Sequence, residues 1–151
     1  MDLLEEVGGI DEGLALVMAR IRKSVRISMR DAARDEGLSQ NEIEVLLFLA
    51  HGKCDTARDI TQFRGISRSL VSKSVDQLLK RGYIEAKQDE NDRRVIHILL
   101  LPKAEQTVKK LDAVRKDFMR RLCEGITREE ADAFMAIVRK MTENVQKNLP
   151  E

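Results

Sequence analysis

The sequence predicts a mainly α-helical fold with one small β-hairpin. Helix-forming residues dominate its 151 positions, and there are only two Pro and eight Gly. Apolar residues recur at helical spacing along most of the chain. The exception is residues 84–101, where two short runs flank a polar loop, a pattern typical of two antiparallel strands.

The length of 151 residues is that of one domain, or of a domain with an oligomerisation element. No apolar run approaches the ~18 residues that span a bilayer, and the acidic start at residues 1–6 lacks the basic region of a signal peptide. We therefore expect a cytoplasmic protein with no membrane segment. In a reducing cytosol the widely separated Cys54 and Cys123 are expected to be free thiols, with Cys123 packed beside an apolar stripe.

The chain begins with a long amphipathic helix over residues 10–36, which Gly37 ends. Its apolar stripe consists of Leu14, Val17, Met18, Ile21, Val25 and Met29. So long and two-sided a helix favours a role between subunits. Next, Ser39 and Glu42 form a capping box for a helix over residues 40–51. That helix is apolar around most of its girth, so we expect it at the centre of the domain.

A helix-turn-helix is predicted in the middle of the chain. Residues 56–62 form a short helix, residues 63–66 a turn, and Ser67 caps a second helix that ends at Gly82. The inward residues of the short helix are Ala57 and Ile60. Two short helices joined by a glycine-containing turn are typical of DNA-binding proteins that place the second helix in the major groove.

The second helix has two contrasting faces. Its buried stripe is formed by Val71, Val75 and Leu78, with Ser74 beside them. The opposite face carries Ser69, Ser72, Lys73, Asp76 and Lys80. Because that face is small, hydroxylated and basic near its start, we interpret residues 67–94 as a reader of DNA.

A hairpin follows the second helix. Residues 84–88 and 95–101 are the strands, and the loop at 89–93 is polar and followed by a second arginine, Arg94. A two-stranded hairpin is marginal alone, so it must pack on the helices. The combination indicates a winged helix-turn-helix.

Two long helices close the chain. Pro102 suits the first turn of a helix over residues 103–124, and a second capping box at 127–130 begins the last helix. The last helix has a narrow seam formed by Phe134, Val138, Met141, Val145 and Leu149, with Ala131 and Ile137 nearby. We therefore predict three regions: an N-terminal dimerisation helix (1–37), a winged helix-turn-helix core (38–101) and C-terminal dimerisation helices (102–151). The alternative is that the long helices pack only within one subunit.

Charge is distributed unevenly. Residues 56–94 carry nine Lys or Arg against six Asp or Glu, a net +3, whereas the rest carries 18 against 20. The asymmetry is modest, and it agrees both with a basic footprint for DNA and with an ordinary solvated surface.

The ordered motifs of residues 38–101 resemble the DNA-binding core of the MarR family of bacterial transcriptional regulators. The resemblance is carried by Leu38-Ser39 before an apolar helix, by the run Ser69 to Lys73, by Leu78 to Ile84 with its Lys-Arg-Gly-Tyr, and by Asp92-Arg93-Arg94 before an apolar strand. The chain departs from the family pattern at residues 101–105, where Pro102 replaces the usual Thr and the later Gly is absent.

The resemblance implies a homodimer that binds a pseudo-palindromic operator on double-stranded DNA and represses or activates nearby genes; of the two, we expect repression. In this family the regulation is often relieved by a small-molecule effector held between the DNA-binding and dimerisation parts. It places one of Arg93 and Arg94 in the minor groove, while Arg94 pairing with Asp92 is the structural alternative. Peroxide-sensing members have a cysteine near the start of the first helix. This chain has none there, so neither cysteine inherits that role.

Eight residues are candidate DNA contacts. Those of the recognition helix are Arg68, Ser69, Ser72 and Lys73, for bases or phosphates; those for phosphate are Arg64 and Lys80; those of the wing are Arg93 and Arg94. Asp76 is expected to pair with Lys73 or Lys80, the alternative being a cytosine amine.

Enzymatic activity is not predicted. The sequence has no Ser/His/Asp set, no glycine-rich phosphate loop and no HExxH pattern, and His51 and His97 lack partners at metal-ligand spacing. We therefore expect no catalytic residue, no metal and no cofactor. The alternative to a DNA-binding regulator is a winged-helix module for protein interaction that does not bind DNA.

Overall fold

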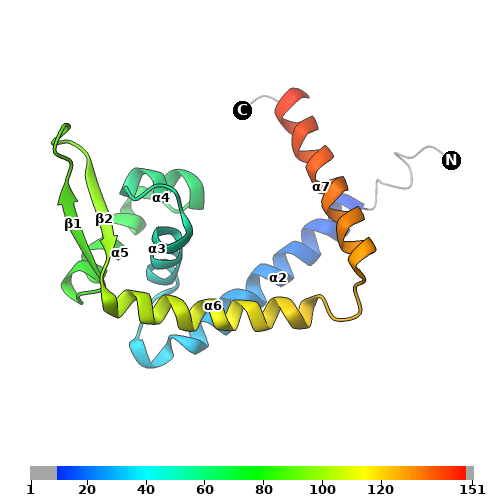
Figure 1. The fold of residues 1–151 in the computed structure, drawn as a ribbon, viewed down its shortest axis with the longest axis horizontal. Helices are drawn as coiled ribbons and strands as arrows, with labels where there is room; N and C mark the ends of the chain where they lie inside the picture. Colours follow the sequence, from blue (N-terminus) through cyan, green and yellow to red (C-terminus); the bar gives the residue numbers. More distant parts are fainter. Residues whose placement is uncertain (1–9, 149–151) are drawn as a thin grey trace. The chain divides into compact units, whose positions relative to one another are not determined.

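The fold is mainly helical with one two-stranded hairpin (Figure 1). A computed structural model describes residues 10–148, with side chains from residue 13 onward. The elements are α2 (Ile10–Ala32), a 3₁₀ turn η1 (Arg34–Glu36), α3 (Gln40–His51), α4 (Ala57–Arg64), α5 (Arg68–Lys80), β1 (Ile84–Gln88), β2 (Ile96–Leu100), α6 (Pro102–Leu122) and α7 (Arg128–Asn148). The predicted seam residue Leu149 lies outside the described residues.

Four of the described helices, α3, α4, α5 and α7, begin where a side chain accepts from a free backbone N–H group. The predicted box at α3 is present: Glu42 N donates to Ser39 Oγ at 3.3 Å, and Ser39 N donates to Glu42 Oε2 at 2.7 Å. The predicted box at α7 is also present, with Thr127 N donating to Glu130 Oε2 at 2.8 Å. Sequence reasoning missed a third box before α4.

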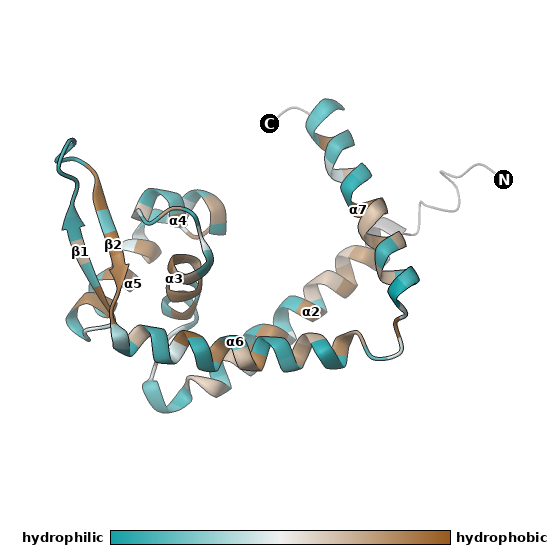
Figure 2. Ribbon diagram, in the orientation of Figure 1, coloured by the Kyte–Doolittle hydropathy of each residue, from teal (hydrophilic) through white to brown (hydrophobic). Residues whose placement is uncertain are grey.

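The hydrophobic core is organised around α3, as predicted. Its buried residues are Ile43, Val45, Leu46, Leu47 and Phe48, and α5 contributes Val71 and Leu78. Figure 2 shows apolar residues concentrated on α3 and β2. From the hairpin and α6, the core receives Tyr83, Ile84, Ile98, Ala104, Val108 and Leu111. This packing holds α5 with its polar face outward.

The hairpin is antiparallel, with Ile84 opposite Leu100 and Lys87 opposite His97. It is tied to the helices through the backbone, because Ile98 N donates to Asp55 O at 2.8 Å. At the strand end, Leu101 N donates to Tyr83 O at 2.9 Å. Leu101 O then accepts from Ala104 N, so Pro102 begins α6 as expected despite its departure from the family pattern.

Several expected details differ in the structure. The α4 helix continues to Arg64, so the turn is confined to Gly65, which has a left-handed φ of 63°, and the two residues that follow it. Ala57 is exposed instead of inward, because it is the first residue of α4. The last turn of the first helix is the 3₁₀ segment η1. Cys123 is exposed rather than packed, and both it and Cys54 are free thiols.

The chain divides into two compact units at Asp117–Phe118. Within the first unit, the N-terminal half of α2 exposes apolar side chains: Leu14, Leu16, Val17 and Met18. Within the second unit, α7 buries none of its residues and exposes Phe134, Met135, Ile137, Met141 and Val145. Among the described helices, none is long and apolar enough to cross a membrane.

Candidate nucleic-acid interface

The recognition helix α5 has the two faces that its sequence predicts. Leu70 N donates to Ser67 Oγ at 3.4 Å, so Ser67 caps the helix. At the other end, Gly82 has a φ of 70°, and Tyr83 N donates to Leu78 O at 3.0 Å, which closes the helix by a Schellman motif. The inward face is formed by Val71, Ser74 and Leu78. The four candidates Arg68, Ser69, Ser72 and Lys73 are all exposed.

The serine hydroxyls at the start of α5 are not equivalent. Ser69 Oγ lies 3.2 Å from Ser67 Oγ, so it shares the capping site. Ser72 is exposed one turn later and has no such neighbour in the described part of the chain. Of the two, Ser72 is therefore the hydroxyl more available to a ligand, and Lys73 lies beside it on the same surface.

The two predicted phosphate contacts, Arg64 and Lys80, differ in how far their side chains are engaged by neighbouring residues. Arg64 lies over the ring of Phe48, with Cζ 5.8 Å from the centroid, and its Nη1 is 3.6 Å from Glu44 Oε2. Lys80 is exposed in the last turn of α5. The predicted pairing of Asp76 with a neighbouring lysine is wrong: among the described residues, Asp76 forms no ion pair, and Asp76, Lys73 and Lys80 are all exposed.

The tip of the hairpin is built by two aspartates. Asp89 Oδ1 accepts from the backbone N–H groups of Asn91 and Asp92, each at 2.8 Å. Asp92 Oδ1 accepts from Arg94 N at 3.0 Å and from Arg94 Nε at 3.2 Å. The Asp92–Arg94 pair, the structural alternative for Arg94, is thus present. Because only Nε of Arg94 is engaged, its two terminal nitrogens can still donate to a ligand, and its side chain is 91% exposed.

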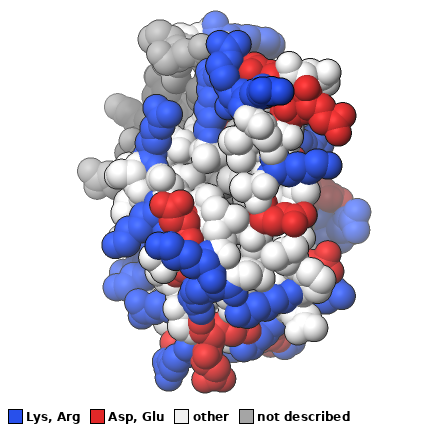
Figure 3. Space-filling view, turned by 90° about the vertical axis from the view of Figure 1, so that its left-hand side faces the viewer, with Lys and Arg blue, Asp and Glu red and all other residues white. Residues whose placement is uncertain are grey.

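Arg93 is held differently from its neighbour. Its carbonyl oxygen accepts from Gln88 Nε2 at 2.6 Å, whereas its guanidinium is exposed. The tip therefore presents two guanidinium groups on a loop whose backbone is fixed by side-chain hydrogen bonds. On the face of the molecule that carries the hairpin, Lys and Arg side chains surround an uncharged centre, with Asp and Glu side chains among them (Figure 3).

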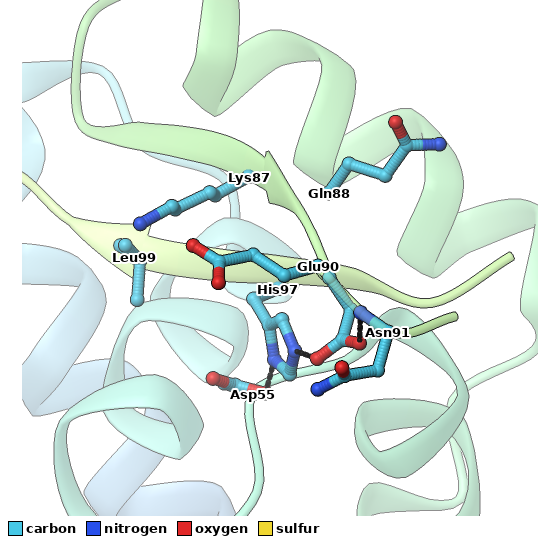
Figure 4. A pocket seen from close by; sticks show the side chains of 8 residues that line it. Asp55, Lys87, Gln88, Glu90, Asn91, His97 and Leu99 are labelled. Atoms are coloured by element: carbon cyan, nitrogen blue, oxygen red, sulfur yellow. Dashed lines mark hydrogen bonds and ion pairs between the residues drawn. The ribbon is translucent and has the colours of Figure 1, made fainter. Parts of the chain in front are cut away.

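A histidine bridge at the base of the tip was missed by sequence reasoning. His97 Nδ1 lies 2.7 Å from Asp55 Oδ1, and His97 Nε2 lies 3.0 Å from Asp89 Oδ2 (Figure 4). The hydrogen bond to Asp55, followed by that to Asp89, raises the pKa of His97 above its usual 6.5. The hydrogen bond from His97 lowers the pKa of Asp89 to about 2. The only signal in the sequence was a single polar residue inside an apolar strand.

The other histidine also has a carboxylate partner. His51 Nε2 lies 2.9 Å from Asp112 Oδ1, which joins the end of α3 to α6. Sequence spacing could not reveal it, because the partners are 61 positions apart. Neither histidine belongs to a metal cluster: within the described residues, no group of three His, Cys, Asp or Glu side chains is placed to hold a metal ion.

A second set of contacts joins the recognition helix to the long helices. Arg81 Nη1 donates to Glu42 Oε1 at 3.4 Å, and Arg81 also donates to the carbonyl oxygens of Glu36 and Gly37. The ring of Tyr83 lies beneath Arg81 and, at 4.2 Å, beneath Lys103 Nζ of α6. Burial raises the pKa of the Tyr83 hydroxyl, which also forms a hydrogen bond with Thr107.

Known proteins share both the sequence pattern and the fold. The MarR family model matches residues 36–95. The HTH-type transcriptional regulator YwhA of Bacillus subtilis is 29% identical over 93 residues, which cover 62% of this chain and 66% of YwhA. The chain therefore spans just under two thirds of that relative's length.

Two solved structures share the architecture. A MarR-family transcriptional regulator from Silicibacter pomeroyi superposes with a TM-score of 0.76 at 23% identity, and the match covers 99% of both chains. A MarR-family regulator from Listeria monocytogenes, solved with a 26mer DNA, gives a TM-score of 0.72 at 18% identity over 96% of this chain and 89% of the other. The capped helix α5 and the arginine-bearing tip of the hairpin both lie within residues 36–95, the part of the chain that matches the MarR family of transcriptional regulators.

Proposed function

We propose that this regulator binds double-stranded DNA as a homodimer, with α5 in the major groove and the hairpin tip at the adjacent minor groove. The observation that carries the proposal is the exposed face of α5, where Arg68, Ser72 and Lys73 lie on a helix whose other face is buried in the core. Such a face can donate to base edges and phosphates. The Listeria neighbour, which was solved with DNA, supports the assignment.

The wing supplies the second part of the proposed interface. Arg93 and Arg94 extend from a loop whose backbone N–H groups donate to Asp89 and Asp92. The loop is therefore fixed while the terminal guanidinium nitrogens remain available to DNA. A guanidinium in the minor groove reads its width and potential more than its sequence. We therefore assign affinity to the wing and sequence preference to α5. Arg64, which is engaged by Glu44, and Lys80 are proposed as phosphate contacts.

The proposed dimer uses the two ends of the chain. The exposed apolar residues of α2 and those of α7 are larger and more numerous than solvated helices normally carry. Each set lies on its own helix, and burial against a second subunit would remove it from water. We accordingly propose the regions 1–37 and 102–151 for dimerisation and 38–101 for DNA binding, acting in the cytoplasm as a repressor that a small effector releases.

The test is footprinting of the purified protein on genomic DNA, with and without candidate small molecules. We expect two protected half-sites about 10 bp apart, because two recognition helices of a dimer enter successive major grooves ~34–36 Å apart. Protection of a single half-site would contradict the dimeric arrangement. Transcription from a footprinted promoter then gives the sign of regulation: an increase when the protein is deleted supports a repressor.

A protein-interaction module without DNA binding is the second candidate. The observation that favours it is the acidity near the proposed interface, where Asp76 is exposed on α5 and Glu90 is exposed at the hairpin. Such carboxylates repel phosphates. Absence of any footprint, together with retention of a folded dimer, would favour this candidate.

A further inference from the structure

The bridge between Asp55, His97 and Asp89 requires a particular protonation state. A carboxylate accepts hydrogen bonds and donates none, and a neutral imidazole has only one N–H. Both ring nitrogens of His97 lie within 3.0 Å of a carboxylate oxygen. The two contacts are therefore both hydrogen bonds only when His97 is an imidazolium.

The bridge joins the segment before α4 to the hairpin loop, two parts of the chain whose relative position shapes the proposed DNA-binding surface. Asp55 precedes α4, and its carbonyl accepts from Ile98 N at 2.8 Å, so backbone and side chain both attach it to β2. Asp89 is in the hairpin loop, where its other oxygen holds the amides of Asn91 and Asp92. Continuous contacts therefore run from the start of the helix-turn-helix to the loop that carries the tip arginines.

We propose that His97 is a positioning residue of the wing: its imidazolium fixes the hairpin loop to the helix-turn-helix, so that the affinity for DNA depends on a single proton. The inference rests on the proposed DNA binding and adds to it a dependence of the affinity on pH. His97 does not itself need to contact DNA.

Other charged groups near the ring of His97 either favour or oppose its protonation. Lys87 stands opposite His97 in the hairpin and opposes its protonation, whereas Glu90 lines the same hollow and favours it (Figure 4). Glu85 lies opposite Leu99, on the same face of the hairpin, and also favours the cation. The carboxylate of Asp59 in α4 is engaged by Thr56 N and Oγ1. The core helices α3 and α5 pack on the other face of the hairpin, which carries Ile84 and Ile98.

The pH dependence has a definite sign. The folded-state pKa of His97 is raised above 6.5, so the bridge is complete below that value and is lost as the pH rises through the raised pKa. On the acidic side, the pKa of Asp89 is lowered from 3.8 to about 2, so its part of the bridge is lost only as the pH falls toward that value. Deprotonation of His97 leaves a ring lone pair facing one carboxylate, so one hydrogen bond of the bridge is lost. It also removes the positive charge that offsets the carboxylates of the loop. Both effects weaken DNA binding.

The bridge itself is tested without DNA, by nitrogen-15 NMR of the histidine rings in the full chain. The His51→Gln variant removes the only other histidine and so assigns the signals. We expect both ring nitrogens of His97 to carry protons at about pH 6.5, and the amides of Asn91 and Asp92 to shift with the same midpoint as the ring. A neutral His97 at that pH, or loop amides that do not follow its titration, would overturn the bridge.

The link to DNA is tested by measuring affinity against pH for one footprinted duplex at constant salt. Wild type and the control His51→Gln should weaken about two- to fivefold as the pH rises through the pKa of His97, the range expected for a partly exposed ion pair. The His97→Gln variant should show no such fall. Asp89→Asn should also keep its affinity, because the new amide can donate to the neutral ring while its carbonyl still accepts from Asn91 N and Asp92 N.

The outcomes separate the two proposals. If the pH-dependent fall persists in His97→Gln, or if Asp89→Asn loses affinity with pH as wild type does, the positioning role is wrong. Absence of DNA binding at every pH overturns the proposed function and its link to the bridge, while the NMR titration still decides whether the bridge exists.

Discussion

Arg81 and Glu42 form an ion pair at 3.4 Å that ties the end of the recognition helix to the start of α3. The same guanidinium donates to backbone carbonyls at the end of η1 and at Gly37. The Glu42 side chain is only 8% exposed, and its other oxygen closes the capping box with Ser39. One carboxylate thus stabilises a helix start and orients α5.

Loss of this pair should destabilise the fold. We expect Arg81→Ala to lower the free energy of unfolding by about 2 kcal/mol, because Glu42 keeps one buried oxygen without its partner. The figure is below that for a fully buried pair because the Arg81 side chain is 31% exposed. Urea denaturation measures it. The matched control Lys80→Ala should stay within about 0.5 kcal/mol of wild type; an equal loss in both variants would contradict the role of the pair.

The two tip arginines should contribute differently to DNA binding. Arg94→Ala removes both a DNA donor and the bond to Asp92, so we expect weaker binding with unchanged preference at the bases read by α5. Arg93→Ala removes only an exposed guanidinium, because its backbone contact with Gln88 remains. Affinity measured on a set of single-base operator variants distinguishes the two effects. A collapse of preference at the central recognition-helix bases in Arg94→Ala would show that the wing assignment is wrong.

The dimer should depend on the exposed apolar face of α7. Phe134 is 55% exposed in the single chain, so Phe134→Glu places a charge where we propose contact with a second subunit. We expect this variant to sediment as a monomer at micromolar concentration, while Lys140→Glu, on the same helix, sediments as wild type. Circular dichroism verifies that both remain helical. A Phe134→Glu protein with the mass of the wild type would argue against the α7 interface.

The start of α7 should respond to acid. Hydrogen bonds from Thr127 lower the pKa of Glu130 below its usual 4.5. Its folded pKa is depressed, so its stabilising contribution is present above pH 4.5 and is lost as the pH falls through the folded value. The amide of Glu130→Gln cannot titrate, so this part of the pH dependence should disappear from its thermal unfolding. Identical acid profiles for wild type and variant would mean that the box does not stabilise the fold.

Local features were predictable from the sequence because neighbouring residues determine them. The capping boxes at Ser39 and Thr127, the faces of α5 and the left-handed Gly82 all depend on residues within one or two turns. The length of α4 was wrong by two residues, since Phe63 continues the helix and stacks on Phe48 at a centroid distance of 6.2 Å. That contact with α3 is tertiary and leaves no local signal.

Contacts between distant segments were not predictable. The His97–Asp55 pair spans 42 positions and the Arg81–Glu42 pair spans 39. Each involves a common charged residue whose partner is selected only when the hairpin and α3 pack together. For the same reason, the candidate DNA contacts could be named from the α5 pattern, while the engagement of Arg64 by Glu44 could not.

The central claim is that α5 and the wing bind the DNA backbone and bases. It is tested most directly by the equilibrium constant for a footprinted duplex as a function of salt concentration. We predict a steep negative slope of log K against log salt, because each neutralised phosphate releases about 0.9 counterion, and a slope shallower by roughly one for each phosphate contact removed, as in Lys80→Ala. A slope near zero, or no binding at low salt by a folded dimer, would contradict DNA binding and favour the protein-interaction module.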